Sequence, residues 1–225
     1  MGEHITFPSN GHTCHGYLAT PATGSGPGVV VIQEYWGLVP HIQDVADRFA
    51  AEGFVALAPD LYHGETATEP DEAAKLMMAL DLPRVARDMS GAVDALLARS
   101  TGEAVGVVGF CMGGGLALWL ATLRPEIAEA VVFYGVIPWP EAKPDFSNIT
   151  GHVLGFFAEH DDFASPEQVR KLEGDLSEAG IPNELTTYAD SEHAFFNDDR
   201  PEVYNAQASD DAWRRTVDAF RTRLS

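Results

Sequence analysis

The chain contains the stretch Val107-Val108-Gly109-Phe110-Cys111-Met112-Gly113-Gly114-Gly115. The apolar residues that lead into it are typical of a buried strand, and a helical pattern follows it. Between them lies the pattern G-x-C-x-G, whose two glycines suit a backbone too crowded for larger side chains. A side chain on such a turn stands clear of the sheet, and the first N–H groups of the next helix favour a thiolate there. The pattern predicts a nucleophile elbow that presents Cys111; the alternative is a buried structural cysteine in a glycine-rich turn.

Strands and helices are expected to alternate along the rest of the chain. The expected strands cover residues 3–7, 13–19, 28–32, 54–58, 104–108, 129–134, 152–158 and 184–188, and the first two form an antiparallel pair. The expected helices cover residues 41–51, 71–79, 83–98, 116–123, 166–179 and 202–223, and residues 60–70 form a loop. This alternation predicts a single α/β domain over residues 1–225, with a mostly parallel central sheet flanked by helices on both faces.

The composition restricts the partners and the compartment. The 225 residues include 34 acidic and 14 basic ones, for a formal net charge of −20. Such a surface repels phosphate backbones and anionic lipids, so we expect neither nucleic-acid nor membrane partners. The acids are dispersed, which is typical of a solvated surface, and adaptation to salt is the alternative. With only two cysteines, no apolar run of about 18 residues and no signal-peptide pattern, the sequence favours the cytoplasm.

A base and an acid are expected downstream of the nucleophile. In folds with such an elbow, the partners follow in the chain order nucleophile, acid, histidine. Asp161 and His193 each lie just past the end of an expected strand, at the sheet edge where ligands bind in α/β proteins. His193 would take the thiol proton and later protonate the leaving group, and Asp161 would orient the imidazole. Asp162 is the alternative acid, and a loop histidine with satisfied hydrogen bonds is the alternative for His193.

A metal centre is not expected. His12, Cys14 and His15 are close in sequence, but in a strand residue 15 faces away from residues 12 and 14. No second cluster with zinc spacing accompanies them in the sequence. The sequence therefore predicts no metal ion and no other cofactor.

The chain resembles the dienelactone hydrolase family in several segments. They follow one another at compatible spacing over nearly the whole chain: Gln33-Glu34-Tyr35-Trp36-Gly37, Ala58-Pro59-Asp60-Leu61-Tyr62, Gly109-Phe110-Cys111-Met112-Gly113-Gly114, Phe133-Tyr134-Gly135 and His193-Ala194-Phe195. The resemblance implies an α/β-hydrolase fold with a triad of Cys111, His193 and Asp161. It also implies that Glu34 interacts with the resting cysteine and helps to form the thiolate when substrate binds. The alternative for Glu34 is a polar loop residue.

The resemblance also implies an oxyanion hole, formed by the backbone N–H groups of Met112 and Tyr35. Each such donor typically contributes about 2.7–4 kcal/mol of transition-state stabilisation. Aromatic residues at strand ends and in loops are expected to line the substrate pocket, with core packing as the alternative. These residues are Trp36, Tyr62, Tyr134 and Phe195, with Tyr35 beside them and Trp139 at the rim.

Two positions depart from the family pattern. Family members are expected to hold a substrate carboxylate with two arginines, where this chain has His63-Gly64 and, four residues after His193, Asn197. Neither glycine nor asparagine offers the planar bidentate contact of arginine. An anionic dienelactone is therefore not the expected substrate, unless Arg84, Arg87 or Arg200 supplies the cation.

Three functions are compatible with these residues. The first is hydrolysis of a small ester or lactone through a cysteine acyl-enzyme. The second is an acyltransferase or thioesterase on the same scaffold. The third is a non-catalytic protein that binds a small molecule, because a fold alone does not fix a function. The assembly is open between a monomer and a dimer.

Overall fold

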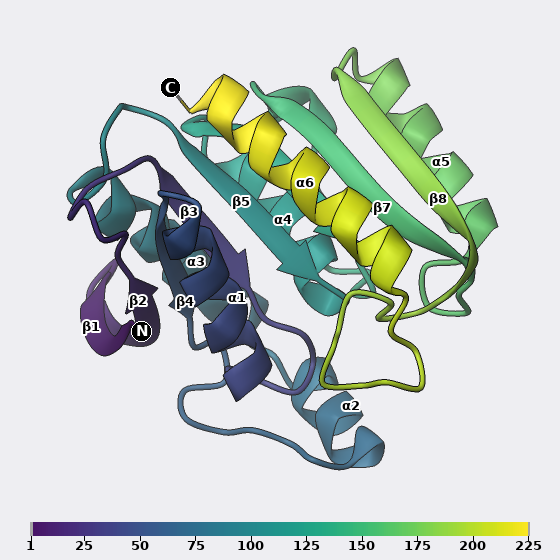
Figure 1. Ribbon diagram of the computed structural model, residues 1–225, viewed down its shortest axis with the longest axis horizontal. Helices are drawn as coiled ribbons and strands as arrows, with labels where there is room; N and C mark the ends of the chain where they lie inside the picture. Colours follow the sequence, from purple (N-terminus) through teal and green to yellow (C-terminus); the bar gives the residue numbers. More distant parts are fainter. Residues whose placement is uncertain (1, 225) are drawn as a thin grey trace.

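The computed structural model describes residues 2–224 and shows alternating strands and helices (Figure 1). The strands are β1 (Glu3–Ser9), β2 (His12–Ala19), β3 (Gly28–Ile32), β4 (Val55–Pro59), β5 (Val105–Phe110), β6 (Ile127–Phe133), β7 (His152–His160) and β8 (Asn183–Glu192). The helices are α1 (Pro40–Ala51), α2 (Pro70–Met78), α3 (Leu82–Leu97), α4 (Met112–Leu123), α5 (Pro166–Glu178) and α6 (Ala206–Arg223), with the short 3-10 helix η1 (Phe146–Asn148). Each strand and helix expected from the sequence has its counterpart here.

The eight strands form one sheet in the order β1-β2-β4-β3-β5-β6-β7-β8. β1 pairs antiparallel with β2, and β2 pairs antiparallel with β4, whereas the strands from β4 to β8 are parallel. Parallel neighbours need crossover connections, and the intervening helices supply them. The predicted fold class, a mostly parallel sheet flanked by helices on both faces, is confirmed.

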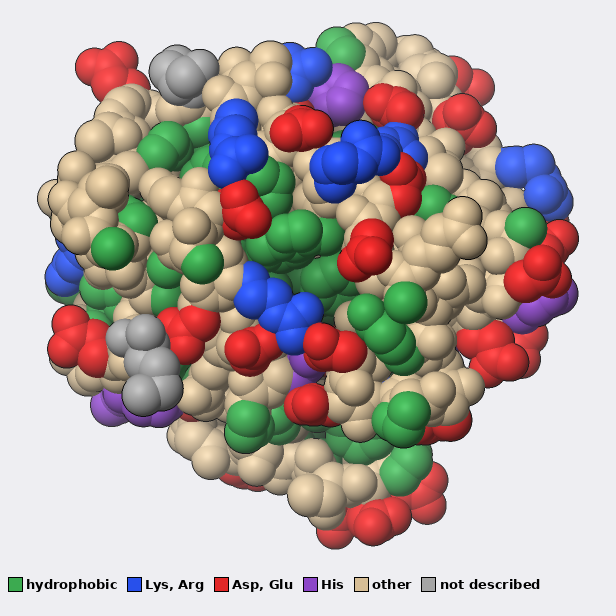
Figure 2. All heavy atoms as spheres, viewed as in Figure 1, with side chains coloured by type: hydrophobic (Ala, Val, Ile, Leu, Met, Phe, Trp, Pro, Cys, Tyr) green, Lys and Arg blue, Asp and Glu red, His purple; other side chains and the backbone are tan. Residues whose placement is uncertain are grey.

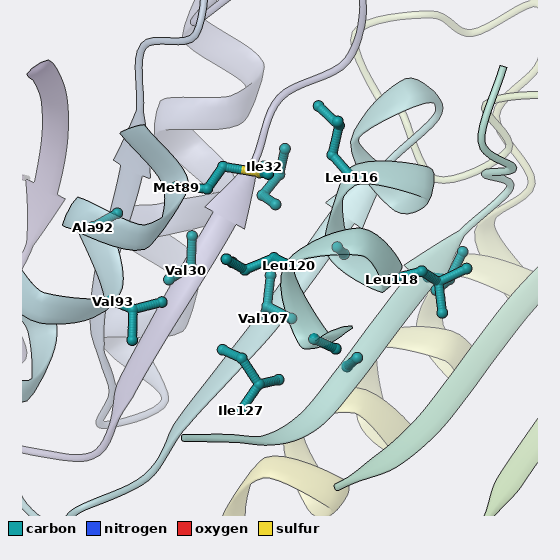
Figure 3. Packing of buried hydrophobic residues seen from close by; sticks show 14 of the residues in the cluster. Val30, Ile32, Met89, Ala92, Val93, Val107, Leu116, Leu118, Leu120 and Ile127 are labelled. Atoms are coloured by element: carbon teal, nitrogen blue, oxygen red, sulfur yellow. The ribbon is translucent and has the colours of Figure 1, made fainter. Parts of the chain in front are cut away.

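The central strands are buried on both faces because helices cover the sheet from two sides. β3 and β5 are buried at every residue, which explains their continuous apolar sequences. On β3, Val30 and Ile32 pack toward α3 and α4, while Val29 and Val31 pack toward α1 and α6. Figure 3 shows the first of these two cores, and Figure 1 shows α1 and α6 in front of the sheet. The parallel strands thus all end at one edge of a rigid scaffold.

The boundaries differ from the sequence expectation at functionally relevant places. α4 begins at Met112 instead of residue 116, because Gly113 to Gly115 are helical despite the low helix propensity of glycine. α6 begins at Ala206 instead of residue 202, because the Asn205 side chain caps the helix by accepting the N–H of Ala208. β8 continues to Glu192 and so extends to the residue before His193.

The surface matches the acidic composition. In the view of Figure 2, acidic side chains are scattered over the face and are not gathered in one patch. None of the helices within residues 2–224 combines the length and the apolar character that a bilayer crossing requires.

Candidate active site

Cys111 occupies a sharp turn between β5 and α4. Its backbone lies in the left-handed region, with φ 56° and ψ −122°, and its N–H donates to the carbonyl oxygen of Phe133 at 3.0 Å. A Cβ added at Gly109 would overlap the carbonyl of Gly113, so the turn closes only with glycine there. A cysteine held at positive φ is strained, and such strain concentrates at functional positions. The side chain is nearly buried, at 5% exposure, at the N-terminus of α4.

Asp161 and His193 meet beyond the ends of β7 and β8. His193 Nδ1 lies 2.8 Å from Asp161 Oδ2, and the other carboxylate oxygen accepts the backbone N–H groups of Phe163 (2.7 Å) and Ala164 (2.8 Å). The imidazole is further confined by two rings that contact it edge-on, Tyr134 at 5.1 Å and Phe163 at 5.4 Å between centroids. Asp162, the alternative acid, is exposed. The structure therefore brings Asp161 to the imidazole.

The charge state of His193 follows from its neighbours. Burial lowers the pKa of His193, but hydrogen bonds to Asp161 and Cys111, together with their negative charges, outweigh burial and raise the pKa to about 10. An imidazole with such a pKa keeps its proton at neutral pH. A positively charged imidazole can stabilise negative charge that develops on a neighbouring sulfur.

Glu34 lies directly after β3 and is almost fully buried, at 1% exposure. Its Oε2 accepts a hydrogen bond from Asn197 Nδ2 at 2.9 Å, and its Oε1 accepts one from the hydroxyl of Tyr134 at 3.3 Å. The pKa of Tyr134 is well above its usual value because of burial first, and then because of the charges of Glu34 and Cys111. Tyr134 therefore stays a neutral phenol that donates to the carboxylate, and it lies close to both Glu34 and Cys111.

Met112 and Tyr35, the expected oxyanion donors, directly follow Cys111 and Glu34 in the chain. Met112 is the first residue of α4, where backbone N–H groups have no partner inside the helix. Tyr35 is half-buried and directly follows Glu34 in the chain, and burial first, then the charge of Cys111, raise the pKa of its phenol. The Met112 N–H at the start of α4 is therefore available as a donor next to Cys111, whereas the role of the Tyr35 N–H stays a prediction.

The four aromatic residues expected in the pocket occupy different environments. Tyr62 donates its hydroxyl to Met112 Sδ at 3.4 Å, and burial and the charge of Cys111 raise its pKa. Trp36 is half-buried, with its ring 6.0 Å from the guanidinium of Arg200. Tyr134 and Phe195 are fully buried. Trp36 is the one of the four that is exposed enough to meet a small molecule, whereas Tyr62, Tyr134 and Phe195 have the burial of core residues.

Phe195 packs against aromatic residues of the site and of β8. Its ring packs edge-on against Tyr134 and Tyr188, each at 5.3 Å between centroids. Trp139, the expected rim residue, is also buried. Its Nε1 donates to the carbonyl oxygen of Met77 at 3.1 Å, and this hydrogen bond connects the loop of Trp139 to the end of α2. Phe195 thus contributes to the site through packing, whereas Trp139 contributes to the packing of its own loop.

The second cysteine lies outside the site. Cys14 is fully buried, and burial together with the charges of Asp88 and Asp60 raises its pKa to about 12. His12 and His15 are exposed, so the structure does not gather these three residues around an ion.

One group within residues 2–224 does have metal-ligand spacing. Glu159, His160 and Asp190 have ligand atoms within 4.8 Å of one another, and all three residues are exposed. Exposed acidic groups often gather in this way without a metal, and we assign no ion to them.

Sequence reasoning missed one contact in the site. From the sequence, Asn197 is only a position where an expected arginine is absent, yet its side chain is buried and donates to Glu34. The available signal was its spacing, four residues after His193, which places it in the turn that carries the histidine.

Known proteins resemble this chain over its whole length. The model of the dienelactone hydrolase family matches residues 14–224. Protein usf of Aquifex pyrophilus is 38% identical over 235 residues, and a protein of Aquifex aeolicus provisionally named carboxymethylenebutenolidase is 34% identical over 233 residues, each over 100% of both chains. Among solved structures, a provisionally named dienelactone hydrolase of Klebsiella pneumoniae has a TM-score of 0.89 at 27% identity and covers 98% of each chain. The family model and these full-length relatives show that the chain belongs to the dienelactone hydrolase family.

Proposed function

We propose that this ester and lactone hydrolase works through a cysteine acyl-enzyme, with Cys111 as nucleophile, His193 as base and Asp161 as the group that orients the base. The observation that carries the proposal is the position of the His193 ring. It is hydrogen-bonded to Asp161 at 2.8 Å, and its raised pKa reflects a hydrogen bond to Cys111 as well. A nucleophile, a base and an orienting acid in contact form the minimal constellation for acyl transfer.

The first half of the reaction would form a thioester. The Cys111 sulfur bonds to the substrate carbonyl carbon while the thiol proton resides on His193. The resulting oxyanion lies toward the N–H groups of Met112 and Tyr35. Collapse of this intermediate breaks the carbon–oxygen bond, and the leaving alkoxide takes the proton from His193. In a lactone, the alcohol so formed stays attached to the acyl group.

The second half would release the acid. A water molecule gives a proton to His193 and attacks the thioester carbon, which forms a second tetrahedral oxyanion. Its collapse breaks the carbon–sulfur bond, and the thiolate and the imidazolium are restored. The same imidazole therefore serves as base and acid in turn, as the chemistry of a nucleophile–histidine–acid triad requires.

The substrate that we propose is a small ester or lactone without a carboxylate. Asn197 and the pair His63-Gly64 occupy the positions of the expected arginine clamp, and the Asn197 amide is already engaged by Glu34. Two carboxylates, Glu34 and Asp161, lie at the site and disfavour an added anion. Of the three arginines that could supply a cation, Arg200 lies near Trp36, 6.0 Å from its ring, but its guanidinium is paired with Glu202 at 2.9 Å. We therefore expect a higher kcat/KM for an uncharged lactone than for a dienelactone carboxylate of similar size.

Replacement of the nucleophile tests this function. Cys111→Ala should abolish turnover of a chromogenic short-chain ester, while circular dichroism and thermal unfolding stay close to those of the native chain. Cys14→Ala is the matched control, because that cysteine is buried away from the site and should be dispensable for turnover. Native turnover in Cys111→Ala would rule out the cysteine mechanism.

A further inference from the structure

The two aromatic rings that contact the imidazole of His193 differ in exposure. Within residues 2–224 they belong to Tyr134 and Phe163, with centroids 5.1 Å and 5.4 Å from the imidazole and planes inclined to it by 67° and 71°. Tyr134 is fully buried, and its hydroxyl donates to Glu34 at 3.3 Å. Phe163 is half-buried, and the side chain of His193 is 28% exposed. Phe163 is therefore the aromatic neighbour of His193 that a small molecule can reach.

The position of Phe163 is fixed by its backbone. Its N–H donates to Asp161 Oδ1 at 2.7 Å, and the N–H of the next residue, the fully buried Ala164, donates to the same oxygen at 2.8 Å. The Phe163 side chain packs against both hydrophobic cores. A ring held in this way loses little conformational freedom when a ligand contacts it. Because the bonds to Asp161 come from backbone groups, a change of the Phe163 side chain leaves them in place.

The leaving group of an ester has to lie beside His193. Nδ1 of the imidazole is engaged by Asp161 at 2.8 Å, so Nε2 is the nitrogen that can protonate the leaving oxygen. General acid catalysis requires that oxygen to lie about 3 Å from Nε2. The carbon atoms attached to the oxygen then lie next to the rings around the imidazole. Tyr134 has no exposed surface to offer them, so the contact falls to Phe163.

We propose that Phe163 is a specificity-determining residue that contacts the alcohol portion of the substrate and favours a flat, apolar alcohol such as a phenol. This inference rests on the proposed cysteine mechanism and adds the class of leaving group to it. Two aromatic rings attract each other when offset or edge-on, whereas a phenyl ring leaves the polar groups of a hydrophilic alcohol without a partner. The alcohol departs when the acyl-enzyme forms, so Phe163 acts on acylation and has no partner during hydrolysis of the acyl-enzyme.

Two acetates whose alcohols have similar acidity provide the test, phenyl acetate and hexafluoroisopropyl acetate. Both form the same acetyl-enzyme, so the ratio of their kcat/KM values reports how well each leaving group is bound during acylation. In Phe163→Ala we expect the ratio of phenyl to hexafluoroisopropyl acetate to fall by about tenfold, the size of effect that one apolar contact in a pocket provides. Hydrolysis of the acetyl-enzyme, followed by rapid quench and mass spectrometry, should stay within about twofold of the native rate.

Two further variants complete the comparison. Phe146→Ala is the matched control, because Phe146 is also half-buried but lies in η1 and is not among the rings that contact His193 within residues 2–224. It should keep the native ratio. Phe163→Leu keeps apolar bulk without the flat ring, and it serves if Phe163→Ala does not fold. For Phe163→Leu we expect the ratio to fall by about threefold, because the apolar contact is kept and the aromatic one is lost.

Two results would overturn the inference. The first is a native ratio in the Phe163 variants. The second is an equal slowing of both esters and of acetyl-enzyme hydrolysis, which would mean that Phe163 only holds the imidazole. If Cys111→Ala is inactive while the Phe163 variants keep the native ratio, only this inference fails. If Cys111→Ala still turns over ester, the proposed function itself fails.

Discussion

The carboxylate of Asp161 holds the imidazole of His193 from a position that is itself fixed. One oxygen lies 2.8 Å from His193 Nδ1, and the other accepts two backbone N–H groups in the loop before α5. An acid with only the histidine as partner could rotate away, but this carboxylate is held at both ends. The orientation of the His193 imidazole is therefore fixed by the loop that carries Asp161.

Replacement of this acid should damage catalysis more than folding. Asp161→Asn keeps the shape, but an amide N–H facing Nδ1 would favour the wrong tautomer of His193. We expect kcat for a short-chain ester to fall by about 10²–10⁴-fold. Asp162→Asn, at the exposed neighbouring position, is the control and should keep native kcat. A kcat for Asp161→Asn within about threefold of native would assign the orienting role to another residue.

The raised pKa of His193 makes a prediction about stability. The pKa rises from its ordinary value of 6.5 to about 10 in the folded chain. A group whose pKa is raised on folding contributes stability that is fully present below the unfolded pKa and is lost as the pH rises through the folded pKa. The free energy of unfolding of the native chain should therefore fall between about pH 6.5 and pH 10. In His193→Gln, this part of the decrease should be missing when urea unfolding is compared at pH 6, 8 and 10, and equal slopes in the two proteins would contradict the assignment.

Much of the fold could be predicted from the sequence because the signals were local. Continuous apolar runs such as residues 28–32 indicate strands buried on both faces, and β3 has that burial. The start of α4 could not be placed, because the glycines that follow Cys111 have poor helix propensity. Their helical state is imposed by close approach to β3, where a Cβ at Gly113 would lie 2.5 Å from the carbonyl oxygen of Gln33. Tertiary packing overrides propensity at that point.

The candidate site could be predicted in part for the same reason. The residues Cys111, Asp161 and His193 follow strands whose carboxyl ends share one sheet edge, so their approach follows from topology. The bond between Asn197 and Glu34 joins residues 163 positions apart, and no pattern in one sequence specifies which amide meets which carboxylate. The burial of Phe195 was equally open, because an aromatic residue beside a site can face either the ligand or the core.

The two cysteines should differ sharply in reactivity. Cys14 is fully buried with its pKa raised to about 12, whereas Cys111 interacts with His193, whose proton favours a thiolate. With iodoacetamide at pH 7.5, we expect one label per chain at Cys111 before Cys14 reacts measurably, as peptide mass spectrometry over time would show. In His193→Gln the preference should shrink, since the thiolate loses its counter-charge. Equal labelling of both cysteines in the native protein would show that Cys111 is not activated.

Replacement of glycine by alanine should have opposite effects on the free energy of unfolding at two helical positions, Gly113 and Gly174. In Gly113→Ala, the new Cβ would lie 2.5 Å from the carbonyl oxygen of Gln33 and 2.6 Å from that of Ile32. Both oxygens belong to the backbone, so they move only if the main chain is displaced. The separation between α4 and β3 must then grow, which should cost about 1–3 kcal/mol in the free energy of unfolding.

The same displacement should move Met112 relative to the segment that carries Glu34 and Tyr35, and a shift of about 1 Å in a site can lower kcat by about a hundredfold. Gly174→Ala in α5 is the control, because a Cβ there meets no atom within 4 Å. It should stabilise the chain by about 0.5–1 kcal/mol and leave kcat unchanged. Urea unfolding and ester kinetics on both variants provide the measurement. If Gly113→Ala kept native stability and kcat, the close approach of α4 to β3 would not be what holds the elbow, and the position of Cys111 would need another explanation.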